Sequence, residues 1–174
     1  MKKISIIIGI LSSLSLSLSA QTTFTADLAG NQEVPPNSSP GYGDAEFSFS
    51  GTTLTITSGS YADLLGNSST IRLADAAVGA NGPTIYAFTL TSPGTTSGTF
   101  TGSDTALTAG QITDLDNGNL YVNLTSNVYP NGEIRGQLEA VPEPSTLALI
   151  GVGSLALLVV RRQSQLPLAL HLRQ

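Results

Sequence analysis

The side chains most able to do chemistry in this sequence are carboxylates, because the central part of the chain has neither histidine nor cysteine. The 174 residues include no cysteine, and the one histidine, His171, lies close to the C-terminus. Without imidazole or thiolate, the segment 21–140 cannot build a Ser-His-Asp or Cys-His catalytic group, and it lacks the usual zinc and copper ligands. We therefore predict no catalytic residue, no metal site and no cofactor in this segment.

The carboxylates themselves give weak signals. Asp114-Leu-Asp116-Asn-Gly118 begins like a calcium-binding loop, but the EF-hand spacing requires an oxygen ligand where Gly118 stands. A tight turn is the favoured interpretation, and a looser oxygen site built from Asp75 and Asn81 remains an alternative. A pair of carboxylates for glycoside hydrolysis also remains open, although no pattern places two of them across a cleft.

The segment 21–140 is strongly acidic. It contains 11 aspartates and glutamates against two arginines and no lysine, which gives a net charge of −9. A surface of this charge repels a phosphate backbone, so we predict that nucleic acid is not a partner. Because no disulfide can form, a hydrophobic core must hold a domain of this length together.

Apolar and polar residues alternate along short runs that glycine, proline and asparagine separate, which predicts antiparallel strands with one buried face. The same period places the charged residues of the last run, Glu133 and Arg135 among them, on a water-facing side. The predicted inward-facing residues are Phe47, Phe49, Tyr86, Phe88, Leu120, Val122, Ile134 and Leu138.

Two local patterns refine this picture. The segment 44–58 is typical of a β-hairpin, and the capping-box spacing from Thr108 to Gln111 predicts one or two helical turns. The predicted fold class is all-β, a single antiparallel β-sandwich or barrel-like domain that spans residues 21–140.

The first 20 residues have the layout of a secretory signal peptide. Lys2 and Lys3 precede an apolar and serine-rich run, 4–18, and small residues follow it. We expect cleavage after Ser19, with cleavage after Ala20 as the less favourable alternative because of Leu18, and we assign residues 1–20 to the signal peptide. The apolar run is shorter than the roughly 20 residues of a spanning helix, but an uncleaved N-terminal anchor remains an alternative.

Near the C-terminus, Pro142-Glu143-Pro144 precedes an uncharged apolar run, and Arg161-Arg162 closes it. This order resembles the PEP-CTERM sorting signal, which membrane-embedded exosortases process in bacteria. The resemblance implies that residues 141–163 form a sorting signal with a transmembrane helix. A short extension, 164–174, follows. We interpret it as a tolerated addition to the signal, and an altered reading frame is the alternative explanation.

The two ends together predict export across the inner membrane to the cell envelope, the outer surface or the extracellular matrix. Before processing, the C-terminal helix would anchor the chain in the membrane. The partners that this arrangement implies are the secretion machinery, an exosortase-type processing enzyme and the membrane itself.

Blocks at opposite ends of the domain carry a second resemblance. Gly30-Asn-Gln-Glu-Val-Pro-Pro36, Leu120-Tyr-Val-Asn-Leu124 and Gly132-Glu-Ile-Arg-Gly-Gln-Leu138 are similar to the CHRD domain, which occurs in chordin and in exported bacterial proteins. The resemblance covers roughly residues 23–139 and implies a β-sandwich or barrel-like fold. Its motif positions, structural or ligand-binding, are Glu33, Pro35, Pro36, Asn123, Glu133, Arg135 and Gly136.

The same blocks suggest a partner for Arg135. Its guanidinium could reach Glu33 across the sheet, and an ordinary surface pair with Glu133 or Glu139 is the alternative. We favour a structural role for Arg135, while contact with a ligand stays open. The glycine at position 136 permits a close approach of a neighbouring strand.

The chain departs from the CHRD pattern at three positions. Many CHRD domains carry two histidines in an Ala-His-Ile-His-like segment and a third after the Tyr-Val-Asn block, and here Thr70, Arg72 and Thr125 stand there. Whatever those histidines do in relatives, metal binding or proton transfer included, this chain cannot do with imidazole.

Taken with the missing imidazole and thiol, the resemblance predicts a non-enzymatic CHRD domain that acts in binding or structure. The candidate ligands are a polysaccharide, another envelope protein or a second copy of the chain. The alternative is a histidine-less relative of a metal-dependent or carboxylate-based enzyme.

Overall fold

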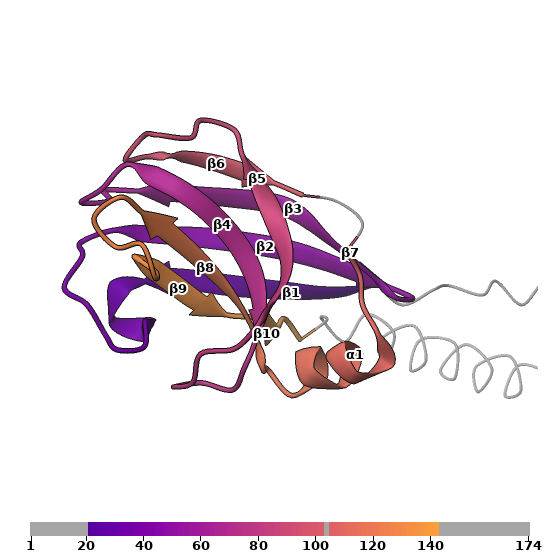
Figure 1. The fold of residues 1–174 in the computed structure, drawn as a ribbon. Helices are drawn as coiled ribbons and strands as arrows, with labels where there is room; N and C mark the ends of the chain where they lie inside the picture. The colour runs from indigo at the N-terminus through magenta and orange to yellow at the C-terminus, as the bar shows by residue number, and fades with distance from the viewer. Residues whose placement is uncertain (1–20, 103–104, 143–174) are drawn as a thin grey trace, which may run out of the picture.

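The computed structural model describes residues 21–102 and 105–142, and within these ranges most of the regular secondary structure is β-strand (Figure 1). The predicted signal peptide and the sorting residues Glu143, Pro144, Arg161 and Arg162 lie outside the described residues. The strands are β1 (Thr22–Ala29), β2 (Tyr42–Ser50), β3 (Thr53–Ala62), β4 (Ser68–Asp75), β5 (Thr84–Leu90), β6 (Gly98–Thr101), β7 (Thr105–Ala106), β8 (Leu120–Ser126), β9 (Ile134–Gln137) and β10 (Glu139–Ala140), and the helices are η1 (Gly30–Gln32) and α1 (Ala109–Asp116).

Eight strands close into an antiparallel barrel. Their order around the barrel is β1-β2-β3-β6-β5-β4-β8-β9, and β9 pairs with β1 through Ala29 and Arg135 to complete the ring. The short strands β7 and β10 pair with β3 and β1 further along these strands than β6 and β9 do. The sequence left a sandwich and a barrel open, and the structure is the barrel. Closure pairs strand edges that would otherwise present unpaired backbone groups.

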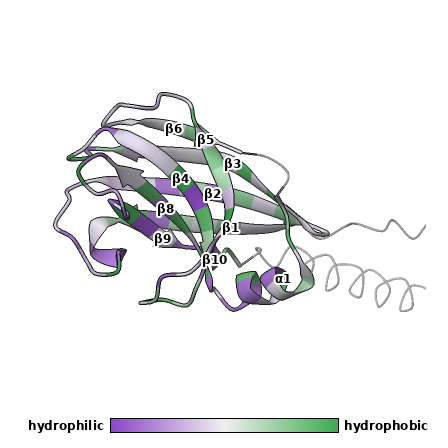
Figure 2. Ribbon diagram, in the orientation of Figure 1, coloured by the Kyte–Doolittle hydropathy of each residue, from purple (hydrophilic) through white to green (hydrophobic). Residues whose placement is uncertain are grey.

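The interior of the barrel is the hydrophobic core. Phe47, Leu120, Val122 and Ile134 are fully buried, as the alternation predicted, while Phe49 and Tyr86 are only half-buried and pack against the core from its edge. In Figure 2 the hydrophobic segments of β4, β5 and β8 lie beside one another, as strands with a shared inner face require.

The helix α1 covers one end of the barrel. Its capping box is as predicted: Gln111 N donates to the Thr108 hydroxyl, and Thr108 N donates to Gln111 Oε1. The segment 114–118, whose sequence begins like a calcium-binding loop, forms the end of this helix and a turn. There Asn119 Nδ2 donates to Asp114 Oδ1 at 3.1 Å, and Gly118 adopts a φ of +69°.

One prediction is wrong. The polar sides of β8 and of the last run were expected to face water, but Glu133 and Arg135 are 0 % and 1 % exposed, and every residue of β8 is buried. The reason is that loops distant in sequence fold over the outer face of the barrel there. Glu139, two residues past the end of β9, is exposed as predicted.

Within the described ranges, none of the helices has both the length and the apolar character that crossing a membrane requires.

The aromatic cluster in the core gives a stability prediction. The ring centroid of Phe88 lies 5.5 Å from that of Tyr86 and 5.9 Å from that of Phe47. Phe88→Ala should therefore lower the free energy of unfolding by about 3–5 kcal/mol in denaturant titrations. Tyr42→Ala, at a side chain that is 57 % exposed, is the control and should change it by less than about 0.5 kcal/mol. An unchanged midpoint for Phe88→Ala would contradict the burial of that ring.

Candidate functional site

The outer face of β4, β8 and β9 carries a row of polar residues that strand register places side by side. Arg72 pairs with Asn123 across β4 and β8, and Asn123 pairs with Arg135 across β8 and β9. Arg72 and Arg135 are the two basic residues of the segment 21–140. The fold therefore gathers both cations of an acidic domain on one outer face.

Glu133, the residue just before β9, connects two loops to the barrel. Its carboxylate accepts hydrogen bonds from Ser39 Oγ at 2.7 Å, from Leu65 N and from Gly66 N. Burying a carboxylate costs several kcal/mol unless hydrogen bonds replace its water. These three donors meet that need, so the charge holds the β1–β2 and β3–β4 loops in place.

Arg135 connects a third loop to the barrel. Its Nη1 donates to Ala80 O at 2.7 Å, its Nη2 donates to Gln137 Oε1 at 3.2 Å, and the guanidinium stacks over the Tyr121 ring at 3.5 Å. Gln137 in turn donates from Nε2 to Ala76 O at 2.8 Å. The β4–β5 loop is therefore fixed to β9 by two outward side chains.

Glu33 lies above the same row, at the end of η1, and is 5 % exposed. Asn123 Nδ2 donates to both of its carboxylate oxygens at 3.1 Å. Burial raises the pKa of the Glu33 carboxyl to about 7, while the charges of Arg135 and Arg72 and the Asn123 hydrogen bond lower it. The suggested pairing of Arg135 with Glu33 is electrostatic, because the hydrogen bonds of Arg135 described above go to Ala80 and Gln137.

The three positions at which many CHRD domains carry histidine lie together on this face. Thr70 and Thr125 are register partners with their hydroxyl oxygens 2.8 Å apart, and Arg72 donates from Nη2 to Asn131 O at 3.0 Å. In this chain the place is a hydroxyl pair beside an arginine. Within the described residues, no cluster of three or more His, Cys, Asp or Glu side chains could hold a metal ion.

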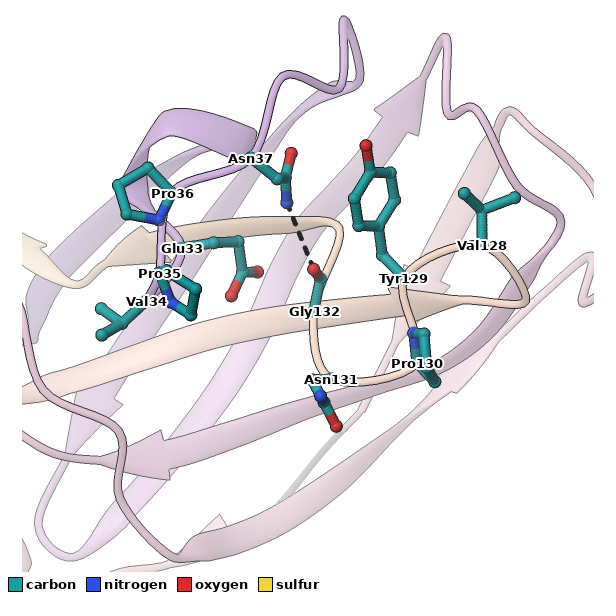
Figure 3. Close-up of a pocket in the computed structure, with 10 residues that line it drawn as sticks. All are labelled: Glu33, Val34, Pro35, Pro36, Asn37, Val128, Tyr129, Pro130, Asn131 and Gly132. Carbon is teal, nitrogen blue, oxygen red and sulfur yellow. Dashed lines mark hydrogen bonds between the residues drawn. The ribbon is translucent and has the colours of Figure 1, made fainter.

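Pro35 and Pro36 form one wall of a pocket, and the β8–β9 loop forms the other. The pocket has a volume of about 220 Å³, and Val128, Tyr129 and Pro130 line its far side. Figure 3 shows the Glu33 side chain extending between these walls toward Gly132. Asn37 Nδ2 bridges the walls by donating to Gly132 O at 3.3 Å and to Glu133 O at 3.0 Å.

A second pocket of about 350 Å³ lies on the other side of the Val34–Pro36 segment. Its lining includes Glu33, Val78, Arg135 and Gln137. Asn81 fixes the loop at this side, since its Nδ2 donates to Val34 O at 2.7 Å. The amide that was a candidate calcium ligand with Asp75 therefore serves as a loop contact.

Two glycines allow the close approaches at this site. A side chain at Gly136 would meet the backbone of Asp27 in β1, and one at Gly132 would meet the Glu33 carboxylate. Of the predicted motif residues, Glu33, Asn123 and Arg135 come together in one cluster. Pro35 and Pro36 line the first pocket. Glu133 lies outside the cluster and bonds the β1–β2 and β3–β4 loops. Pro142, the last described residue, is exposed.

The sequence indicated no functional role for Asn37, Ser39, Tyr129 or Gln137. Gln137 shares the spacing of two with Glu133 and Arg135, and that pattern indicates a common face without indicating that the face is covered. The other three lie in loops, and the contacts of Asn37 and Ser39 with Glu133 depend on the tertiary fold.

The structure is an all-β barrel in which residues of the block 132–138 anchor the surrounding loops. Comparison with known families accords with it. The model of the CHRD domain matches residues 24–138, and the model of the PEP-CTERM protein-sorting motif matches residues 140–163. The chain therefore belongs to the CHRD domain family. The sorting motif indicates an exported protein that is targeted to an exosortase. Neither a curated protein nor a solved structure matched the chain.

The contacts of Arg135 predict that lysine cannot replace it. Lysine has no planar fork, so Arg135→Lys should lose the bonds to Ala80 and Gln137 and lower the free energy of unfolding by about 2–3 kcal/mol. Arg72→Lys is the matched control and should cost less than about 1 kcal/mol, because Arg72 is half-buried. Equal losses in the two variants would show that burial does not distinguish the arginines.

The raised pKa of Glu33 predicts a pH dependence of stability. The folded state holds the Glu33 proton up to about pH 7, whereas an ordinary glutamate releases it near 4.5. The stabilisation, of about 3 kcal/mol, is present below pH 4.5 and is lost as the pH rises through 7. Glu33→Gln should therefore flatten the fall in stability between pH 5 and 8, which urea titrations would measure.

The matched control for this prediction is Glu46→Gln, at an exposed carboxylate of β2. It should leave the pH profile of the unaltered chain in place. A Glu33 pKa near 4.5 in NMR titration would contradict the prediction.

Proposed function

We propose that the chain is an envelope or matrix protein whose CHRD domain is a non-enzymatic binding module. The observation that carries this proposal is the use of the motif side chains: Glu133 and Arg135 donate or accept hydrogen bonds that fix loops. Together with the bonds of Asn37 to Gly132 and Glu133, the Glu133 contacts hold the pocket between the Pro35–Pro36 segment and the β8–β9 loop in place. A pocket whose walls are held in advance favours binding, because little conformational entropy is lost when a ligand enters.

The position of the pocket supports the proposal. Val141 N donates to Thr23 O, so the two ends of the described chain leave the barrel side by side. The segment that forms the pocket follows the opposite end of β1, whose eight residues span roughly 25 Å (Figure 1). A domain attached at its C-terminal end would present this pocket away from the attachment.

The enzyme alternative finds less support. Glycoside hydrolysis by carboxylates requires two of them on opposite sides of the scissile bond. Within the described residues, Glu33 is the only acid that lines either pocket. A binding module needs no second carboxylate, so the lining suits it better.

The C-terminal tail completes the proposal. Arg161 and Arg162 would remain on the cytoplasmic side of the membrane and leave the acidic domain outside. The tail would be a temporary anchor that the exosortase cuts near Pro142-Glu143-Pro144. A permanent one-helix anchor is the competing hypothesis.

Intact mass of the native protein distinguishes these two hypotheses. In exosortase-competent cells the mature species should lack residues 145–174, and in cells without exosortase it should keep them. A variant in which alanines replace Pro142, Glu143 and Pro144 should keep them in both. A species from competent cells that still carries residues 145–174 would contradict processing.

Retention in the matrix tests the binding role. Tyr129→Ala removes the aromatic ring of the pocket, so the fraction of protein held in the envelope and matrix should fall severalfold relative to the medium. Tyr42→Ala, at an exposed tyrosine that lines neither pocket, should not change that fraction. Immunoblots of both fractions measure it, and equal retention of the two variants would oppose the binding role of this pocket.

A further inference from the structure

We infer that the pocket beside Glu33 binds an uncharged sugar ring of a polysaccharide. This inference rests on the proposed binding function and names the ligand class for it. The pocket places a buried carboxylate beside proline and tyrosine side chains. A polar surface and an apolar surface therefore line the same pocket. A pyranose ring has the same two characters, with hydroxyls around its edge and C–H groups on its faces.

Charge selects an uncharged ligand. Asn123 bonds both Glu33 and Arg72, and Arg135 lines the second pocket together with Glu33. The two guanidiniums outnumber the one carboxylate, so the site does not attract a cationic ligand as a lone carboxylate would. An anionic polymer would be repelled by that carboxylate and by the net charge of −9 of the domain.

The hydrogen-bonding capacity of Glu33 suits hydroxyl groups. Above its pKa of about 7 the Glu33 carboxylate is ionised, and an ionised carboxylate accepts up to about four hydrogen bonds. Both oxygens of Glu33 share a single side-chain donor, Asn123 Nδ2. Two neighbouring hydroxyls of a sugar can each donate to one oxygen, and the bonds are strong because the acceptor is charged.

The walls and the volume suit a single ring. Pro36, Tyr129 and Pro130 offer flat apolar surfaces, and the face of an aromatic ring attracts the C–H groups of a sugar. A volume of about 220 Å³ is below the roughly 300–1,000 Å³ of drug-sized pockets, so one sugar unit fills it.

The second pocket indicates that the ring belongs to a polymer. It lies across the Val34–Pro36 segment, shares Glu33 with the first pocket and has a volume of about 350 Å³. A chain of linked rings can place one unit in each pocket. An extended peptide would instead pair with a strand edge, and in the described part of the chain β8 and β9 are paired on both sides.

Binding of defined oligosaccharides to the full-length protein in a non-glycosidic detergent tests the inference. The probes are a neutral glucose tetramer, an oligogalacturonate and a chitosan oligomer, each measured by calorimetry. The neutral tetramer should bind, and Glu33→Gln and Tyr129→Ala should each weaken its binding by about tenfold or more. Glu46→Gln and Tyr42→Ala are matched controls that should leave binding unchanged. Circular dichroism confirms folding of each variant, and Tyr129→Ala carries the test if Glu33→Gln does not fold.

Three outcomes would overturn the inference. Binding of the acidic or basic oligomer alone, with the same dependence on Tyr129, would keep the pocket as a binding site and reject the uncharged ring. Binding of the neutral tetramer that no variant weakens would place the sugar elsewhere. Failure of every probe to bind would also reject it, and matrix retention that still depends on Tyr129 would then leave the proposed function standing.

Discussion

The structure depends on the burial of charged side chains on the outside of a closed barrel. An ionised group loses several kcal/mol of hydration when it is covered, so its partners must be supplied by the chain. Around β9, Glu133, Arg135 and Gln137 point outward at a spacing of two. Glu133 receives its partners from the β1–β2 and β3–β4 loops, and Arg135 and Gln137 receive theirs from the β4–β5 loop. Because these groups are costly to bury without partners, the loops are stabilised in the positions in which they supply those partners.

The pocket follows from this constraint. Glu133 and Asn37 hold the β1–β2 loop against the start of β9, Asn123 holds Glu33, and Arg135 holds the β4–β5 loop beside it. Gaps remain on both sides of the Val34–Pro36 segment, and Glu33 lines both. The barrel contributes the rigid base, because its core packs independently of these outer contacts. The hydrophobic core and the two pockets therefore lie on opposite faces of the barrel wall.

Much of the fold could be predicted from the sequence, because alternation, turn residues and a capping box are local signals. The hairpin 44–58, the helical turn after Thr108 and the inward-facing apolar residues all depend on neighbours in the chain. The sequence left the choice between a sandwich and a closed barrel open, since closure depends on the pairing of Ala29 with Arg135. The burial of Glu133 was also missed, because its partners Ser39 and Leu65 lie 94 and 68 positions away. A period of two shows which residues share a face, and only the tertiary fold shows whether a loop covers it.

Hydrogen exchange at the amides of Leu65 and Gly66 tests most directly whether buried charge fixes the loops. Both amides donate to Glu133, so they should exchange slowly in the unaltered chain, although they lie in a loop. Glu133→Gln replaces an acceptor with a donor that faces them and should accelerate their exchange by about tenfold or more, while the strand amides of the core stay protected. Glu139→Gln, at an exposed carboxylate on the same run, should leave them unchanged. Exchange of Leu65 and Gly66 at unprotected rates in the unaltered chain would contradict the account.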